Sequence, residues 1–209
     1  MITFINTTDI KITEKTAVVI GKFDGEHRGH RKLFRTLKEE ANKKGLKTVV
    51  FSFRTLPSNI VRNKNTTQIF TNVERRRKLE ELGIDYYIEY PFDMNIARLT
   101  GEEFLVDILI GKLGMAEIVA GDDAAFGYKK SGNIELLNKL SKSLGFDLRI
   151  ITKEKDDFQN DISSTLIRSK LDEGDMEEAN KLLGSIYSIT GTVEEVVPKL
   201  IKYYKQNSK

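Results

Sequence analysis

The sequence contains no cysteine. This excludes disulfides, zinc sites built on thiolates, iron–sulfur clusters and a cysteine nucleophile in one step. Long apolar runs are absent as well: no stretch approaches the roughly 20 apolar residues of a membrane span, and the first ten residues lack the basic-then-apolar pattern of a signal peptide. These absences predict a soluble, cytoplasmic protein without a membrane partner, whose chemistry uses other side chains.

Neither sign of charge dominates the sequence. The 34 basic and 31 acidic residues are largely interspersed and leave a net charge of +3, which suits a small anionic ligand better than a long polyanion. Nucleic acid is therefore not an expected partner. Two basic runs, ERRRK at 74–78 and the tail at 199–209, are predicted to be solvated surfaces rather than phosphate contacts.

The apolar pattern switches between short β-rich runs and longer helical periods, which is typical of a sheet with crossover helices. Strands are expected at 16–21, 47–53, 85–90, 116–121 and 146–152, and helices at 28–44, 71–82, 100–113 and 132–144. Near-continuous apolar strands indicate burial on both faces, as in parallel sheets. The fold class predicted is therefore α/β, a Rossmann-like doubly wound parallel sheet of about five strands.

Helix boundaries carry recognisable signals. Thr100 followed by Glu103 makes a capping-box pattern. Glycines stand where four helices are expected to stop, at positions 45, 83, 114 and 145. Two more helices, predicted after residue 162, form a C-terminal helical subdomain. The domain is expected to span 1–186, with 187–209 as a short strand and tail.

In a doubly wound sheet, ligands bind at the carboxyl ends of the strands. The loops after Ile20, Phe53, Val119 and Ile151 are therefore where chemistry is expected. The first of these loops begins the segment GKFDGEHRGH at 21–30, which is rich in glycine and contains both histidines of the chain.

Three glycines in this segment allow tight turns and close approach of the backbone to a ligand, and the start of the following helix offers unpaired amides to an anion. His27 and His30, the two histidines of the chain, lie three residues apart, so both rings can reach the same phosphate oxygens. A surface His27 with a helix-capping His30, or a zinc pair, are the alternatives. The zinc pair lacks further obvious ligands. The segment predicts a triphosphate site.

The segment fits neither the dinucleotide fingerprint nor the P-loop. It resembles instead the HxGH nucleotidylyltransferase superfamily, whose second signature is a Ser/Thr-rich helix start followed by a basic residue. ISSTLIR at 162–168 has this form. Its hydroxyls and amides can hold phosphate oxygens, and Arg168 adds a delocalised cation. Taken alone, the segment would be an ordinary helix cap with a surface charge.

Four segments narrow the resemblance: GKFDGEHRGH, AGDDAAFGYKKSG at 120–132, residues 162–184, and the following YSITGTV. In this order, over about residues 15–197, the chain resembles the FMN adenylyltransferase module of bacterial bifunctional riboflavin kinase/FAD synthetases. That family converts FMN and ATP into FAD and pyrophosphate, with Mg2+ on the triphosphate. The resemblance implies direct attack of the FMN phosphate on the α-phosphorus, without a covalent enzyme intermediate.

The resemblance also implies roles for individual residues. His27, His30 and Arg168 would be catalytic, the histidines at the α-phosphate and Arg168 at the β,γ end. Residues expected to bind ATP are Gly21, Phe23, Asp24, Gly25, Gly29, Ser163, Ser164 and Thr165. Residues expected to bind FMN are Phe53, Pro57, Asp123, Phe126 and Gly127. For Phe53 and Phe126, ordinary core packing is the alternative.

The sequence departs from the family in the acceptor site. Ala124 and Ala125 replace larger side chains, and Arg54 stands where the family has an acidic residue. A different phosphorylated acceptor, or a non-catalytic nucleotide or flavin sensor, therefore stay as alternatives. Family members commonly continue into a riboflavin kinase barrel. The sequence predicts no riboflavin kinase activity here, so that a separate riboflavin kinase would supply FMN.

Overall fold

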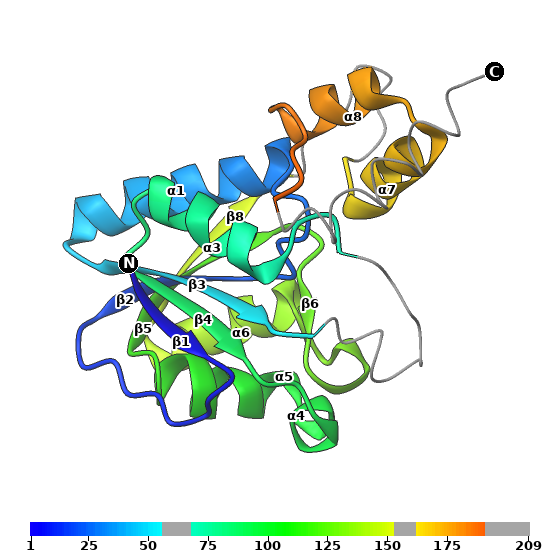
Figure 1. Cartoon of the computed structure of the whole chain (residues 1–209). Helices are drawn as coiled ribbons and strands as arrows, with labels where there is room; N and C mark the ends of the chain where they lie inside the picture. Colours follow the sequence, from blue (N-terminus) through cyan, green and yellow to red (C-terminus); the bar gives the residue numbers. More distant parts are fainter. Residues whose placement is uncertain (56–67, 153–161, 191–209) are drawn as a thin grey trace.

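The computed structural model describes residues 1–55, 68–152 and 162–190 (Figure 1). Pro57 and the basic tail at 199–209 lie outside these residues. So does most of the strand expected around 187–196, and residues 185–190 are assigned to no helix or strand.

The main sheet has six parallel strands in the order β1-β4-β3-β2-β5-β8. Their bounds are β1 Ile2–Ile5, β2 Thr16–Ile20, β3 Lys47–Phe53, β4 Tyr86–Tyr90, β5 Met115–Gly121 and β8 Asp147–Ile151. The five predicted strands are confirmed to within about one residue at each end. The sixth, β1, was not predicted, because it is a half-exposed edge strand whose outer residues Ile2 and Ile5 face solvent.

Helices cover both faces of the sheet, as expected for a doubly wound fold (Figure 1). On one face α1 (Arg28–Lys44) and α3 (Asn72–Glu81) pack against the sheet through Phe34, Leu37 and Leu79. On the other face lie α6 (Ile134–Leu144) and the segment that begins as α5 (Gly101–Glu103) and continues as a π-helix (Phe104–Ile110). The core is therefore two apolar layers separated by the sheet.

The predicted helix ends are confirmed. The Thr100–Glu103 capping box is formed, and a second box joins Thr71 to Glu74 at the start of α3. Gly45 and Gly145 end α1 and α6 in the left-handed conformation. Three short elements were not predicted: α4 (Met94–Arg98), the hairpin of β6 (Ala125–Phe126) and β7 (Gly132–Asn133), and a 3-10 turn at Tyr128–Lys130.

The C-terminal helices are α7 (Ser164–Glu173) and α8 (Met176–Leu183). They share an apolar cluster of their own, which includes Ile69 and Phe70 from the chain segment before α3. Arg31 of α1 donates to the carbonyl oxygen of Gly184 at 2.9 Å. The predicted helical pair is thus packed beside the start of α1 (Figure 1).

The strand order reverses at β2, whose neighbours are β3 and β5. In open α/β sheets such a reversal opens a crevice at the carboxyl ends of the strands. The segment 21–30 follows β2 and the segment 122–124 follows β5, so both predicted loops lie at this switch point.

Candidate active site

The loop after β2 is wound tightly against its own side chains. Phe23, Gly25 and Glu26 all have positive φ angles, of 47°, 95° and 32°, a conformation that costs a non-glycine residue free energy and clusters at functional sites. A side chain at Gly21 would meet the Phe23 ring at 2.7 Å. The loop therefore favours glycine at position 21. It is followed directly by α1, of which His27 is the N-cap residue.

His27 and His30 stack on each other, with ring centroids 3.8 Å apart and planes inclined by 24°. Phe23 lies edge-on to His30 at 5.2 Å. Burial lowers the pKa of His27 to about 4, against the opposing effect of Asp24. Burial, then His27 and Arg75, hold the pKa of His30 well below its usual range. Both rings are therefore neutral at physiological pH before a ligand binds.

Each histidine has its Nδ1 atom buried without a hydrogen-bond partner in the described part of the chain. The His27 side chain makes no cap hydrogen bond to the helix. Two buried ring nitrogens in the segment 21–30 thus lack, among the described residues, the hydrogen-bond partner that a buried polar atom ordinarily has. The alternative of a surface His27 with a helix-capping His30 does not fit, because His27 is buried and is itself the N-cap residue, while His30 lies within α1.

Asp24 joins the two predicted motifs. Its side chain is 1% exposed, and its carboxylate accepts hydrogen bonds from the Ile69 amide at 2.8 Å and from Arg168. The Ser164 hydroxyl donates to the Asp24 carbonyl oxygen. Ser164 and Arg168 lie 140 and 144 positions after Asp24 in the sequence, and their contacts with it hold the start of α7 against the loop after β2.

The remaining residues of the second motif lie at the same helix start. Ser163 is the N-cap of α7 and accepts from the Leu166 amide at 3.2 Å. Thr165 is exposed. The structure therefore brings the predicted ATP-binding residues of both motifs into one region, with the N-termini of α1 and α7 both beside the loop.

The expectation that 74–78 is a solvated surface is wrong for two of its residues. Arg75 is 1% exposed and donates to the Ser52 hydroxyl at 3.3 Å and to the Tyr87 hydroxyl at 3.5 Å. Arg76 pairs with Glu89 at 2.5 Å. Helical spacing could have indicated the burial of Arg75, because position 75 lies four residues before the buried Leu79 and therefore on the same face of α3. Arg77 behaves as predicted, with 76% of its side chain exposed.

Glu26, inside the first motif, was also overlooked as a functional candidate. Only 3% of it is exposed, and its Oε1 atom has no hydrogen-bond partner among the described residues. Burial raises the pKa of Glu26 to about 7, against the opposing charges of Lys78, Arg31 and Arg75. The carboxyl group is thus half-protonated near neutral pH.

The raised pKa of Glu26 predicts how the free energy of unfolding changes with pH. The folded pKa lies above the unfolded value of 4.5, so the folded state binds the proton more tightly and loses stability as pH rises from about 4.5 through 7. Replacing Glu26 with glutamine is expected to raise the free energy of unfolding by up to about 3 kcal/mol at pH 8, and by much less at pH 5. Urea unfolding of both proteins at the two pH values measures this. A difference that is equal at pH 5 and pH 8 would contradict it.

The predicted acceptor residues that the structure describes lie at or after the carboxyl ends of β3 and β5. Phe53 and Phe126 both contact Phe104, with ring centroids 6.2 and 5.9 Å apart. Gly127 has a φ of 70°, and a side chain there would meet the Gly101 amide nitrogen at 2.4 Å. Asp123 is exposed in the loop after β5. Packing alone therefore explains Phe126 and Gly127 in the structure, while Asp123 faces solvent.

Arg54, the basic departure from the family, has a partner. Its guanidinium lies 3.7 Å from a carboxylate oxygen of Glu89, which is fully buried and also pairs with Arg76. One buried carboxylate therefore faces two guanidinium groups at the carboxyl ends of β3 and β4. Arg54 is held at this edge rather than extending freely into solvent.

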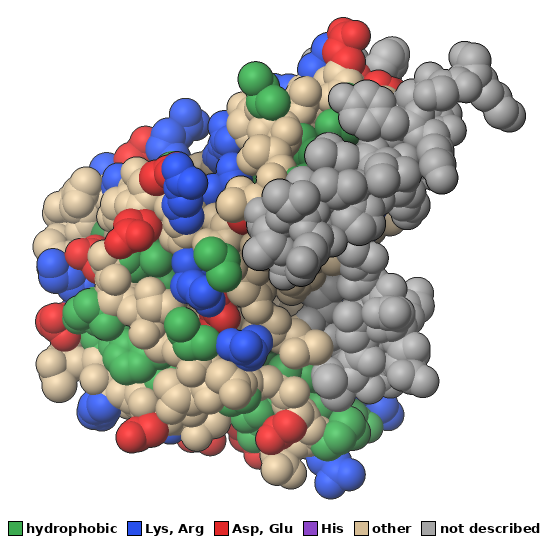
Figure 2. All heavy atoms as spheres, in the orientation of Figure 1, with side chains coloured by type: hydrophobic (Ala, Val, Ile, Leu, Met, Phe, Trp, Pro, Cys, Tyr) green, Lys and Arg blue, Asp and Glu red, His purple; other side chains and the backbone are tan. Residues whose placement is uncertain are grey.

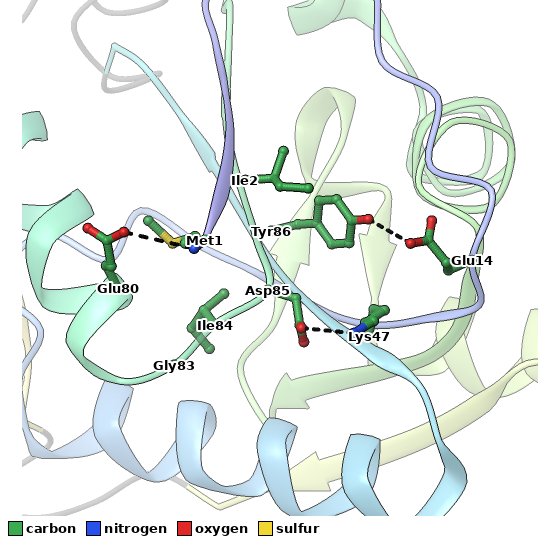
Figure 3. A pocket seen from close by; sticks show the side chains of 9 residues that line it. All are labelled: Met1, Ile2, Glu14, Lys47, Glu80, Gly83, Ile84, Asp85 and Tyr86. Atoms are coloured by element: carbon green, nitrogen blue, oxygen red, sulfur yellow. Dashed lines mark hydrogen bonds and ion pairs between the residues drawn. The ribbon is translucent and has the colours of Figure 1, made fainter.

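A hollow of about 500 Å³ opens elsewhere, at the amino ends of β1, β3 and β4 (Figure 3). Its polar groups pair with each other: the Tyr86 hydroxyl donates to Glu14 at 2.9 Å, and Lys47 lies 3.3 Å from Asp85. The histidine pair follows the carboxyl end of β2, so the two sites lie at opposite ends of the sheet.

Basic and acidic residues are interspersed on the surface, as the sequence predicts. Figure 2 shows basic and acidic side chains scattered over the same face.

Within 1–55, 68–152 and 162–190, no three His, Asp or Glu side chains are grouped as a resident metal ion requires. No helix of the described residues is long and apolar enough to cross a membrane.

A doubly wound parallel sheet, with this loop and this helix start meeting at its switch point, defines an α/β protein with a candidate nucleotide site at the carboxyl ends of its strands. The chain belongs to the FAD synthetase family, whose model matches residues 9–166. It is 37% identical over 184 residues to the bifunctional riboflavin kinase/FMN adenylyltransferase of Buchnera aphidicola subsp. Schizaphis graminum, covering 88% of this chain and 59% of that protein. The chain thus spans about three fifths of the length of the curated relatives it matches.

Two solved structures are similar. One is titled a macrolide-efflux protein from Streptococcus pneumoniae, with 32% identity, a TM-score of 0.79, and coverage of 89% of this chain and 70% of that one. The other is a pantoate-beta-alanine ligase from Francisella tularensis, with 17% identity, a TM-score of 0.54, and coverage of 97% and 86%. The second likeness concerns the fold alone.

Proposed function

We propose that this chain transfers the adenylyl group of ATP to FMN, giving FAD and pyrophosphate. The observation that carries the proposal is the contact of Asp24 with Ser164 and Arg168, in a chain of the FAD synthetase family. This contact supports a shared triphosphate site, because the starts of α1 and α7 and both histidines lie around one loop.

The triphosphate would lie between the N-termini of α1 and α7. Unpaired amides at both helix starts favour phosphate oxygens. Arg168, held by Asp24, would meet the β- and γ-phosphates, and His27 and His30 the α-phosphate.

The histidines would act as charge-stabilising groups rather than as nucleophiles. Transfer between phosphates requires mainly positioning and stabilisation of developing charge. The pKa of each ring is depressed in the free protein, and a polyanionic ligand nearby favours the protonated form. Triphosphate binding is therefore expected to draw protons onto the pair, where the positive charge is needed.

Magnesium would arrive with the triphosphate. In nucleotide sites Mg2+ keeps several waters and is bound mostly by substrate phosphates with one or two carboxylates. The ion would neutralise charge on the leaving pyrophosphate. Among the residues of this chain, the histidine pair and Arg168 would share that task.

FMN would enter from the carboxyl ends of β3 and β5. Asp123 is exposed there and can accept hydrogen bonds from ribityl or ribose hydroxyls. Phe53 and Phe126 would offer apolar surface to the ring system, in addition to their packing on Phe104. Pro57, which the family resemblance also assigns to FMN binding, lies outside the described residues.

An acceptor panel tests the proposal. The purified chain is incubated with ATP, Mg2+ and either FMN, riboflavin or a panel of other phosphorylated metabolites, and products are resolved by chromatography and flavin fluorescence. FAD and pyrophosphate are expected in equal amounts from FMN, with no FMN formed from riboflavin. Pyrophosphate release with another acceptor but not with FMN would contradict FMN as the substrate. Nucleotide binding without turnover on any acceptor would favour a sensor.

A further inference from the structure

Arg75 is a buried cation whose donors are only partly satisfied. With 1% exposure it bonds to Ser52 and Tyr87 through one nitrogen, Nη1, while Nε and Nη2 have no partner in the part of the chain that the structure describes. Burying a guanidinium this way is costly unless it is paired or serves another purpose. Such a group in a native fold therefore calls for an explanation.

Arg75 is connected to the loop after β2 by a short chain of hydrogen bonds. Its Nη1 donates to the Ser52 hydroxyl at 3.3 Å, and this hydroxyl donates to the Lys22 carbonyl oxygen at 3.2 Å. The Gly21 amide donates to the Phe51 carbonyl oxygen at 3.1 Å, one residue before Ser52. The end of β3 thus fixes the loop backbone at the point where it leaves β2.

The charge of Arg75 also reaches the histidine pair. It contributes to the depressed pKa of His30, after burial and His27, and it opposes the raised pKa of Glu26. The other charged groups acting on this loop are Asp24 within it, Arg31 from α1, and Lys78 and Glu81 from α3. Arg75 is the member of this set that combines burial with a hydrogen-bonded connection to the loop.

We propose that Arg75 is a positioning residue for adenylyl transfer. Through Ser52 it holds the 21–26 backbone so that His27 and His30 face the α-phosphate, and its charge adds to burial and to His27 in disfavouring the protonated form of His30 before the triphosphate arrives. The proposal deepens the function proposed above and rests on it. Arg75 itself touches neither substrate nor reacting atoms.

Three variants separate the two parts of this role. Arg75→Lys keeps the charge but not the planar donor set, Arg75→Gln removes the charge, and Ser52→Ala cuts the connection to Lys22 while leaving the guanidinium in place. Arg77→Gln is the matched control, because it removes a charge from the same helix at an exposed position paired with Glu81. Ser52→Ala also keeps the test decisive if a substitution of buried Arg75 prevents folding.

The chain has two histidines, so NMR resolves one titration for each without any assay of activity. In Arg75→Gln the His30 titration is expected to move to higher pH, whereas Arg75→Lys and Arg77→Gln leave it near the wild-type position. In Ser52→Ala and Arg75→Lys, kcat for FAD formation is expected to fall roughly tenfold or more, with a smaller change in KM for ATP. A merely structural Arg75 would lower the melting temperature without moving the His30 titration.

Wild-type kcat in both Ser52→Ala and Arg75→Lys would overturn the positioning role, and an unmoved His30 titration in Arg75→Gln would overturn the charge role. Absence of FAD formation by the wild-type chain would contradict the proposed function instead. The histidine titration would then decide the effect of Arg75 on His30 by itself.

Discussion

Replacing His27 with asparagine is expected to lower kcat for FAD formation by roughly 10²- to 10³-fold, the usual effect of removing one preorganised group from a charged transition state. His27 stacks on His30 and is the N-cap of α1, and its side chain bonds to no residue of the helix. The ring is therefore free to act on the ligand. Asparagine keeps a polar side chain and is a favourable N-cap, so folding is expected to persist.

Steady-state kinetics with varied ATP, together with thermal unfolding, measures this effect. KM for ATP is expected to change less than kcat, since charge on the α-phosphate develops in the transition state. Arg35→Gln serves as control, because Arg35 lies on α1 with 72% of its side chain exposed and pairs with Glu39. A His27→Asn variant within twofold of wild-type kcat would contradict the role proposed for the pair.

Replacing Asp24 with alanine is expected to destabilise the fold by about 3 kcal/mol or more, as found when one partner of a buried ion pair is removed. The change leaves Arg168 without this carboxylate and removes the acceptor of the buried Ile69 amide. For a chain of this size, the melting temperature should fall by about 6–12 °C. Affinity for ATP should fall as well, because α7 is no longer held against the loop after β2.

Thermal unfolding and ATP titration of the variant measure both effects. Glu81→Ala is the matched control: it removes an exposed carboxylate that pairs with exposed Arg77 on α3, and exposed pairs contribute about 0–1 kcal/mol. If the two variants unfolded at the same temperature, Asp24 would not join the two motifs in the way the structure indicates.

Much of the fold was predictable because its strands are buried on both faces. Continuous apolar runs such as TAVVI and KTVVFSF produce the central strands and need no other information. Strand β1 was not predicted, because an edge strand has a half-exposed pattern that short apolar runs in loops share. The hairpin of β6 and β7 is two residues long on each side, too short for any period to appear.

The two phosphate motifs were predictable because each is local. Glycines, histidines and a capped helix start lie within ten residues, and their chemistry does not depend on distant partners. The sequence predicts that both motifs bind the same triphosphate, but it does not predict that Asp24 connects them. Nothing in the sequence says which side chains meet across about 140 positions.

Residues whose environment depends on distant partners could not be placed from the sequence. Arg75 stands in a basic run and is buried because Ser52 and Tyr87 surround it. Arg54 was noted as a departure from the family, while its partner Glu89 lies 35 positions away. Composition predicts solvation for such residues, and only the packed sheet shows otherwise.

In the function we propose, the loop after β2 and the start of α7 direct the α-phosphate of ATP to an FMN phosphate. The most direct test follows ATP labelled at the α-phosphorus, with Mg2+ and FMN, through a reaction with the purified chain. We expect the label to appear in FAD, in an amount equal to the pyrophosphate released, with none bound to protein. Label in a protein adduct, or in AMP with no labelled FAD, would contradict it.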